Sequence, residues 1–211
     1  DGSENDWTWL AACEADVHRV CCDASDEGVL RSTVQRLHAK YLGVRSVFHA
    51  AHHLVDGILA NQIAPNFAAV YAPKVLGATV LHAATMCARL QMFNVFSSAA
   101  GTMGSAGQSP HSAANAWLNT MADYRRCLGM PGQSVSWGAV AEIGYAARAG
   151  ADRRANLSGS GAISRSMAVS ALRVSLHESN HPSFVVLPAD WSRLLGGASE
   201  VHGFLTPYAH F

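Results

Sequence analysis

Residues 92–126 carry the clearest pattern in the chain and read MFNVFSSAAGTMGSAGQSPHSAANAWLNTMADYRR. The segment Met92–Phe96 is a short, mainly apolar run, which predicts a β-strand. The small residues from Ser97 to Gly107 predict a loop. Ser112–Arg126 has the apolar spacing of a helix, and Gly129 just beyond it is suited to cap the carboxyl end. This stretch therefore predicts a strand, a loop and a helix in that order.

The same alternation continues toward the amino terminus. Strands are predicted at Val17–Cys22 and Ser46–Ala51, because both are short runs of β-forming residues. Helical spacing predicts one helix at Glu27–Ala39 and a longer one at Phe67–Ala88. Within the longer helix, Pro73 predicts a kink or a restart, since proline cannot donate the backbone hydrogen bond of that turn.

Toward the carboxyl terminus, strands are predicted at Ser134–Trp137 and Phe184–Leu187. Between them, Ser164 is suited to cap a helix that runs to about His177. The Gly-, Ser-, Ala- and Arg-rich stretch Ala149–Gly161 predicts a mobile loop. Strands that alternate with helices predict an α/β fold with a doubly wound parallel sheet, in which ligands lie at the carboxyl ends of the strands.

The composition is that of one globular domain. The chain has 211 residues, 49% of them hydrophobic and 14% charged, which is enough for a full hydrophobic core. Lys plus Arg and Asp plus Glu balance at 15 each, and the apolar run Val75–Leu90 is too short and too polar for a bilayer span. We therefore expect neither a nucleic-acid nor a membrane partner. The histidines His49, His52 and His53 have no acidic neighbour in the sequence, so no metal site is predicted.

The cysteines and the amino terminus indicate the cytoplasm. An odd number of cysteines without CxxC spacing predicts small, buried apolar side chains in a reducing compartment. These cysteines are Cys13, Cys21, Cys22, Cys87 and Cys127. The first six residues are polar and acidic, unlike a signal peptide.

Four polar residues have the chemistry to act on a carbonyl group: Lys74, Ser98, His111 and Asn115. His111 and Asn115 are four residues apart, so they lie on one face of the predicted helix. Ketone reduction needs a proton donor for the developing alkoxide and hydrogen bonds that hold the carbonyl oxygen. Ser98, which directly follows a strand, can supply such a hydrogen bond. The Lys74 ammonium can ease proton loss from a nearby weak acid.

Several short segments, taken in their order along the chain, carry a family resemblance. They are Ala72–Ala78, Val95–Gly101, Gly104–Gln108, Ala113–Ala116, Ser136–Gly138 and Val186–Trp191. Together they resemble the ketoreductase domains of modular polyketide and fatty-acid synthases, which belong to the short-chain dehydrogenase/reductase superfamily. The resemblance implies a Rossmann-like fold and NADPH as the cofactor. The implied substrate is a β-ketoacyl thioester on the phosphopantetheine arm of an acyl carrier protein.

The resemblance covers the carboxyl-terminal two-thirds of such a domain. It implies that residues 17–195 are the ketoreductase domain, that residues 1–16 are a remnant of the preceding region, and that residues 196–211 are a tail or linker toward neighbouring synthase domains. The family's first strand–helix unit, with the Gly-rich turn that seats the cofactor pyrophosphate, has no counterpart in this sequence. We therefore expect the chain alone to bind NADPH poorly.

The resemblance also assigns catalytic roles to Lys74, Ser98 and Asn115, and it exposes one departure. The family carries a tyrosine thirteen residues after the serine and four before the asparagine, and this chain has His111 there. The Lys74 charge disfavours an imidazolium, and the imidazole is shorter than a phenol, so we expect His111 to donate a proton poorly. The first hypothesis is thus an NADPH-dependent ketoreductase impaired by His111.

Further residues are assigned to the cofactor by the same resemblance. Asp23 resembles the position that meets the adenine, while Ala50 and Ala51 stand beside the cofactor at a strand end. His52 replaces the family's glycine next to them, which predicts crowding. Trp137 and Gly138 are the cofactor-side residues at the end of another strand.

Two positions bear on stereochemistry. Asp56, in the segment Leu54-Val55-Asp56, partly matches the segment that marks the class giving the D-hydroxy product. Met103 stands where the opposite class carries tryptophan. Both positions therefore point to the D-hydroxy class.

Two other functions stay open at this stage. One is a catalytically silent structural domain that shapes a multidomain synthase and docks its carrier protein, which His111, His52 and the missing Gly-rich turn favour. The other is a free-standing reductase of small carbonyl compounds, which is disfavoured because the segments around Trp137 and Trp191 are those of synthase domains.

Overall fold

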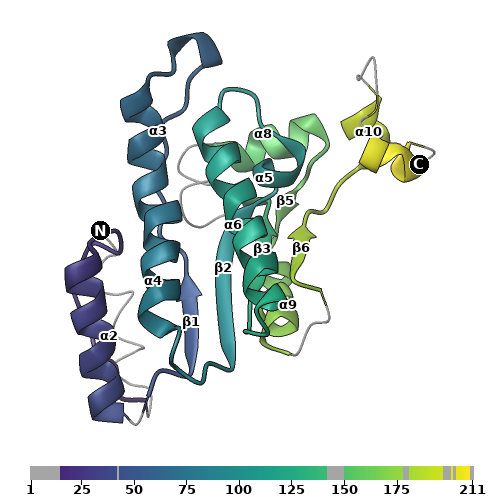
Figure 1. The fold of residues 1–211 in the computed structure, drawn as a ribbon. Helices are drawn as coiled ribbons and strands as arrows, with labels where there is room; N and C mark the ends of the chain where they lie inside the picture. Colours follow the sequence, from purple (N-terminus) through teal and green to yellow (C-terminus); the bar gives the residue numbers. More distant parts are fainter. Residues whose placement is uncertain are drawn as a thin grey trace.

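The fold is built on a parallel β-sheet (Figure 1). The computed structural model describes residues 15–41, 43–141, 150–177, 181–196, 201 and 203–209. The strands of the main sheet are β1 (Ser46–His49), β2 (Met92–Ser98), β3 (Gln133–Trp137) and β6 (Ser183–Val186). They lie in the order β1-β2-β3-β6, and every neighbouring pair is parallel. The predicted α/β class with a parallel sheet is confirmed.

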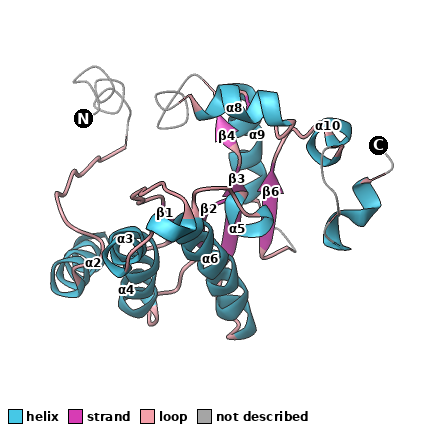
Figure 2. Cartoon of the chain, turned by 90° about the horizontal axis from the view of Figure 1, so that it is seen from above, coloured by secondary structure: helices cyan, strands magenta, loops and turns pink. Residues whose placement is uncertain are grey.

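Helices cover both faces of this sheet (Figure 2). On one side lie α2 (Glu27–Tyr41), α4 (Gly77–Thr85) and α6 (Ser109–Cys127), and on the other lie α8 (Ala151–Ser158) and α9 (Arg165–Leu176). The first layer is filled by an apolar cluster of Val47, Ala78, Phe93, Val95 and Leu118. The second is filled by Val135, Ile163 and Val186. The sheet is therefore doubly wound, as the alternation of strands and helices predicts.

The long helix predicted at Phe67–Ala88 is present and changes its winding at Pro73. It consists of α3 (Ala64–Tyr71), a π-helical turn η2 (Ala72–Leu76) and α4. Pro73 has no N–H to donate, so the regular hydrogen-bond ladder is interrupted there and the turn widens. Single π-turns inside helices often occur at functional sites, and this one carries Lys74.

The combined helix Ala64–Thr85 is long and apolar enough to cross a membrane, with a mean hydropathy of 1.3 and 28% of that window buried. In this fold it lies beside α2 and α6 (Figure 2). It also carries Lys74, which is only 3% exposed. One face of this helix is turned to the sheet, since Lys74 Nζ donates a hydrogen bond to Phe96 O in β2.

The segment from β2 to α6 is more ordered than the sequence predicts. β2 extends through Ser98, and the predicted loop contains the short helix α5 (Ala100–Met103). α6 begins at Ser109, three residues early, because Pro110 fits the first turn, where its missing N–H costs nothing. Gly129 adopts φ 72° just after α6, so its predicted role at the helix end is confirmed.

The predicted strand Val17–Cys22 is wrong. The structure gives this segment no regular secondary structure, and Val17 and Val20 are 43% and 48% exposed. A strand needs a neighbour that satisfies its backbone groups. No strand of the described part of the chain pairs with this segment.

The predicted loop at Ala149–Gly161 is also wrong in part. Residues 151–158 form α8, which is bounded by Gly150 and Gly159, both with left-handed φ values of 65° and 86°. These glycines begin and end the helix at no steric cost. The helix between them packs near β4 (Ala139–Val140) and β5 (Ala162–Ile163), a small second sheet that periodicity did not reveal.

The cysteines are not buried as predicted. Cys21, Cys22, Cys87 and Cys127 are free and exposed. They lie in the irregular amino-terminal segment, in the turn after α4 and at the end of α6, where the chain meets solvent. Cys13 lies outside the described residues.

The carboxyl-terminal elements follow the prediction closely. Ser164 caps α9, because its Oγ accepts a hydrogen bond from Met167 N at 3.2 Å. β6 begins one residue before the predicted strand and also ends one residue earlier. The remaining elements are η1 (Leu59–Asn61), α10 (Trp191–Leu195) and η3 (Gly203–Tyr208).

Candidate functional site

The carboxyl ends of the strands bring small and polar residues to one edge of the sheet. Ser98 is the last residue of β2, Gly138 directly follows β3, and residues 50 and 51 directly follow β1. The ends of β2 and β3 are tied together, because Ala99 N donates to Trp137 O at 2.9 Å. Parallel α/β sheets bind ligands at this edge, so this edge is the candidate site.

Lys74 reaches this edge from the π-helical turn. Its Nζ donates a hydrogen bond to the carbonyl oxygen of Phe96 in β2, at 3.1 Å. Burial lowers the pKa of Lys74 to about 8, because desolvation destabilises the ammonium relative to the neutral amine. Lys74 is thus a buried group beside the end of β2, where its charge acts strongly on its neighbours.

His49, the last residue of β1, holds the turn that carries Lys74. Its Nε2 donates to Lys74 O at 3.2 Å, and burial lowers the pKa of the ring. Gly77 leaves the room for this ring, since a Cβ at that position would lie 3.0 Å from Cε1 of His49. No local signal in the sequence marks this role of His49, because the contact joins residues 25 positions apart.

Asn115 lies in the second turn of α6 and is completely buried. Its Nδ2 donates to His111 O at 2.7 Å, and its backbone oxygen accepts from Ser97 Oγ at 3.0 Å. Its Oδ1 is buried and has no hydrogen-bond partner among the described residues. An unpaired buried acceptor is costly, so Asn115 offers a fixed acceptor for a bound water or ligand.

Gly101 lets α5 approach α6 at this point. A Cβ at residue 101 would lie 2.8 Å from Ala116 N and from two atoms of Asn115. No side chain fits such a distance without moving one of the helices. In the sequence Gly101 is one of several small residues, and nothing local marks the close approach because it involves the next helix.

Replacing Gly101 by alanine is expected to lower the free energy of unfolding by about 1–3 kcal/mol, the usual cost of overpacking. Urea unfolding of the two proteins measures this change. Gly28→Ala is the matched control, because a Cβ at Gly28 in α2 would meet only Asp26 Oδ1, at 3.4 Å. The control should be neutral or stabilising by up to about 1 kcal/mol. Equal effects of the two substitutions would contradict the close approach.

His111 lies in the first turn of α6 and is largely buried. Burial, followed by the charge of Lys74, lowers its pKa to about 4, while the carboxylate of Asp56 acts in the opposite direction. Its Nδ1 is buried without a partner among the described residues. The imidazole is therefore neutral at pH 7.

Two further buried or half-buried histidines are also held neutral. Burial lowers the pKa of His49, and burial together with the Arg125 charge lowers that of His82. His82 Nδ1 lies 2.7 Å from Arg125 Nη1 and must accept that hydrogen bond, which a protonated ring cannot do. Below the unfolded-state pKa near 6.5, the unfolded chain takes up protons that the folded chain excludes. Stability is therefore lost as the pH falls from about 6.5 toward 4.

We expect the free energy of unfolding to drop by about 2 kcal/mol between pH 7.5 and pH 5 through His111 alone. The other two histidines act in the same direction. Urea unfolding at the two pH values measures the drop. His111→Tyr should show a drop smaller by about the same 2 kcal/mol, because tyrosine does not titrate in this range. Identical pH dependence of the two proteins would contradict a neutral, buried His111.

Ser98 occupies the end of β2 with its side chain half-buried. Its Oγ accepts a hydrogen bond from Ala100 N, at 3.2 Å. In the described part of the chain, no hydrogen bond joins Ser98 to Lys74 or His111. The hydroxyl hydrogen is thus available to an acceptor on a bound molecule.

Asp56 is held against the loop that precedes α6. Gln108 Nε2 donates to both of its carboxylate oxygens, at 3.1 and 3.2 Å, and Gly57 N donates to Gly107 O at 2.8 Å. Met103, the last residue of α5, is half-buried in the preceding segment. The role of Gln108 was not predicted, because its partner lies 52 residues away in the sequence.

Asp23 is one of the residues that the family resemblance assigns to the cofactor side. Asp23 is exposed, and its Oδ1 accepts from Ser25 N and Oγ at 2.8 and 2.7 Å, which lowers its pKa. The adjacent Ala24 lies close to Gly77, since a Cβ on Gly77 would be 3.4 Å from the Ala24 Cβ. Ala24 and the ring of His49, the last residue of β1, therefore border the same glycine, so Asp23 lies near the end of β1.

A nicotinamide dinucleotide fits this edge only in part. Trp137 Nε1 is buried without a partner in the described part of the chain, and Gly138 leaves no room for a side chain, because a Cβ there would lie 2.9 Å from Leu187 Cδ1. Trp137 Nε1 and Asn115 Oδ1 are thus polar atoms left unpaired by the described residues that suit a bound polar group, whereas the space beside Gly138 is filled by Leu187 and Val186 O. No Gly-rich strand-to-helix turn for the pyrophosphate lies within the described residues. Nor do these residues contain a group of three or more His, Cys, Asp or Glu side chains placed to hold a metal ion.

Comparison with known proteins agrees with this arrangement. The family model described as "KR domain" matches residues 1–142. The "Phthioceranic/hydroxyphthioceranic acid synthase" of Mycobacterium bovis is 42% identical over 135 residues, which are 64% of this chain and 6% of that protein. "Polyketide synthase GfsB" of Streptomyces halstedii is 36% identical over 184 residues, or 87% of this chain and 3% of that protein.

Solved structures show the same relationship. The chain superposes with a TM-score of 0.92 and 28% identity on a structure of A-type ketoreductases from a modular polyketide synthase, covering 99% of this chain and 45% of that one. The ketoreductase from the first module of phoslactomycin biosynthesis in Streptomyces sp. HK803 gives a TM-score of 0.87 and 30% identity, covering 94% and 46%. The chain thus spans less than half of these solved structures and a small part of the curated synthases.

Proposed function

Because this chain belongs to the KR domain family of polyketide synthases, we propose that it is an NADPH-binding ketoreductase domain whose reduction of a β-ketoacyl thioester is strongly impaired by His111. Lys74, Ser98 and Asn115 are the proposed catalytic residues beside it. Asp23, Ala50, Ala51, Trp137 and Gly138 are the proposed cofactor-binding residues. These assignments are supported by the positions of Ser98, Trp137 and Gly138 at the carboxyl ends of β2 and β3, the edge where parallel sheets bind ligands.

One observation carries the proposed impairment, namely a histidine with a buried Nδ1, unpartnered among the described residues, at the position where the family has tyrosine. When bound, NADPH would supply a hydride to the keto carbon. The carbonyl oxygen then needs a proton and hydrogen bonds from the protein. A neutral imidazole N–H is a weaker acid than a phenol, and the imidazolium that would be a strong acid forms only near pH 4.

The other proposed catalytic residues keep side chains that are suited to ketone reduction. Ser98 can donate its hydroxyl hydrogen to the carbonyl oxygen, because its hydrogen bond from Ala100 N leaves that hydrogen free. Asn115 offers its unpaired Oδ1 to a water that connects the site to solvent. Lys74 supplies the positive field that favours an oxyanion. Asp56 and Met103 are the proposed substrate-side residues of the D-hydroxy class.

A silent structural domain is the second candidate. The observation that favours it is the replacement of two family residues at one edge of the sheet, His111 for tyrosine and the exposed His52 for glycine. Such a domain would support its neighbours in a synthase and contact the acyl carrier protein without turnover. On this proposal, residues 17–195 form the ketoreductase domain, residues 1–16 belong to the preceding region and residues 196–211 lead to the next domain.

The proposed setting follows from the relatives, which are multidomain synthases. The partners are neighbouring synthase domains and an acyl carrier protein with its phosphopantetheine-bound acyl chain. The proposed location is the cytoplasm, where synthase substrates and NADPH are available. Neither a nucleic-acid nor a membrane partner is proposed.

A hybrid domain tests the proposal, because the chain spans 46% of the phoslactomycin ketoreductase that it resembles. The amino-terminal half of that ketoreductase is joined ahead of this chain, and the intact ketoreductase is the control. NADPH binding is followed by the cofactor's fluorescence, and reduction of a β-ketoacyl thioester by the absorbance of NADPH. We expect the hybrid to bind NADPH and to turn over at a trace of the control rate. Binding without any turnover would favour the silent domain, and turnover at the control rate would overturn the impairment.

A further inference from the structure

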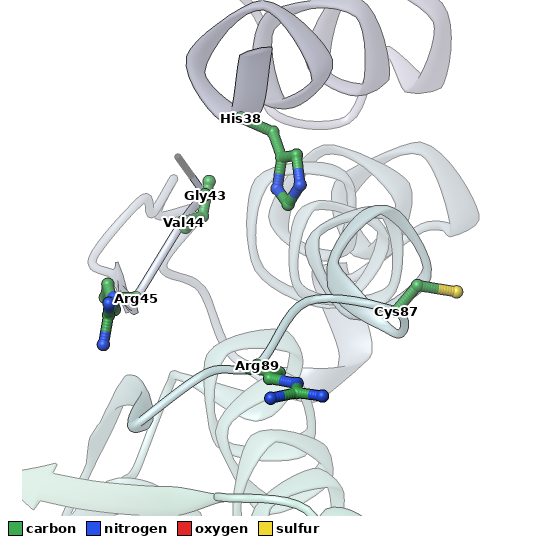
Figure 3. A pocket seen from close by; sticks show the side chains of 6 residues that line it. All are labelled: His38, Gly43, Val44, Arg45, Cys87 and Arg89. Atoms are coloured by element: carbon green, nitrogen blue, oxygen red, sulfur yellow. The ribbon is translucent and has the colours of Figure 1, made fainter. Parts of the chain in front are cut away.

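A second group of polar residues lies at the opposite edge of the sheet. A cavity of about 450 Å³ is lined there by His38, Gly43, Val44, Arg45, Cys87 and Arg89 (Figure 3). Arg45 directly precedes β1, and Arg89 lies in the segment between α4 and β2. Gln91 N donates to Arg45 O at 2.7 Å, which ties the two segments together. The cavity therefore lies at the amino ends of β1 and β2, away from Ser98 and His111.

The lining is cationic and carries no counter-charge. Two guanidinium groups and one imidazole border the cavity, and no residue in its lining is acidic. None of the ion pairs of the described residues involves Arg45 or Arg89. Both arginine side chains are exposed and so can be reached from solvent. Unpaired guanidinium groups at a hollow favour planar, bidentate recognition of an anion.

The position of His38 depends on Gly43. Gly43 has φ 118°, a conformation that other residues rarely adopt, and a Cβ there would lie 3.3 Å from Cε1 of His38. Figure 3 shows the His38 ring extending from α2 toward the space bordered by Gly43 and Arg89. The glycine thus allows the backbone to pass close to the imidazole, which a side chain at residue 43 would displace.

We propose that this cavity binds a small phosphorylated molecule through Arg45, Arg89 and His38. Two guanidinium charges match a dianionic phosphate monoester better than a single carboxylate. The volume is in the range of small-molecule sites and leaves room for an organic group attached to the phosphate. This inference does not depend on the ketoreductase reaction, because the residues lie at the other edge of the sheet.

Calorimetric titration of the 211-residue chain with inorganic phosphate, at constant ionic strength, tests the inference. We expect saturable binding that weakens at least about tenfold in Arg45→Gln and in Arg89→Gln, since each loses a charge-assisted hydrogen bond. Both side chains are exposed, so both variants should keep the parent's circular dichroism spectrum. Binding at a single site should also raise the unfolding temperature of the parent but not of the double variant.

Two matched controls separate this site from other sources of binding. Arg36→Gln removes the same charge from α2 at a residue that does not line the cavity. Lys74→Met removes the cation at the other edge of the sheet. Both controls should bind phosphate with unchanged affinity. Absence of saturable binding would overturn the proposal, and so would an equal loss of affinity in Arg36→Gln or a loss confined to Lys74→Met.

Discussion

Replacing His111 by tyrosine is expected to raise the rate of NADPH-dependent reduction by at least about 100-fold, the usual contribution of a positioned proton donor. Tyrosine restores the acid that the KR family carries at this position. Burial near Lys74 penalises an imidazolium, whereas the same cation would stabilise a phenolate and so ease proton loss from the phenol. The side chain at residue 111 is thus expected to decide whether the domain reduces its substrate at a trace rate or at least about 100 times faster.

The comparison is made in the hybrid domain, with the rate taken from the loss of NADPH absorbance in the presence of a β-ketoacyl thioester. His53→Tyr serves as the matched control, because it makes the same substitution at an exposed position near β1. The control should leave the trace rate unchanged. A parent rate close to that of His111→Tyr would show that His111 is itself a competent acid. If neither protein turns over, the defect extends beyond His111, and His52→Gly becomes the next substitution to test.

Lys74→Met in the His111→Tyr background is expected to lower the reduction rate about 100-fold or more, and at the same time to leave the domain as stable or more stable. The two effects have one cause. Desolvation lowers the pKa of Lys74 to about 8, so its charged form destabilises the fold by up to about 3 kcal/mol. Methionine has a similar length and no charge to desolvate, so it removes this cost.

Rate and stability are measured on the same samples, by NADPH absorbance and by urea unfolding. Arg36→Gln is again a suitable control, because it removes a cation that lies outside the site. A loss of rate together with a comparable loss of stability would show that Lys74 mainly supports the fold, through its hydrogen bond to Phe96 O. An unchanged rate would remove Lys74 from the proposed catalytic residues.

The features of the fold that were predictable from the sequence are those set by local spacing. The strands β2, β3 and β6 were found because apolar runs of β-forming residues lie between polar or small residues, and Ser164 was found because a cap lies next to the helix that it starts. The segment Val17–Cys22 shows the limit of this reasoning. Its residues favour a strand, but a strand also needs a neighbour, and none of the described strands lies beside it.

The helix α8 shows a second limit. Its sequence, ADRRANLS, lies between glycines and is mostly polar, and that composition also suits a loop. What distinguishes the two is the left-handed backbone at Gly150 and Gly159, which the sequence alone does not reveal. A polar helix of this kind depends on its tertiary setting more than on its own pattern.

For the candidate site, the sequence indicated the reactive groups but not their supports. Spacing and family resemblance together led to Lys74, Ser98, His111 and Asn115. They did not lead to His49, which holds the backbone of Lys74, or to Gln108, which holds Asp56. Each of these supporting residues is hydrogen-bonded to a partner far away in the sequence, 25 residues for His49 and 52 for Gln108. No local pattern marks them.

Direct titration of His111 by NMR tests the central claim, namely that this side chain is a neutral imidazole and a poor proton donor at physiological pH. The ring nitrogen and carbon-bound hydrogen shifts of ¹⁵N-labelled histidines are followed between pH 8 and pH 4, and His111 is assigned from the spectrum of His111→Tyr. We predict that His111 remains neutral down to about pH 5, with a pKa of about 4. A pKa at or above the ordinary value for histidine would contradict the account, because an imidazolium would then be available to protonate the substrate.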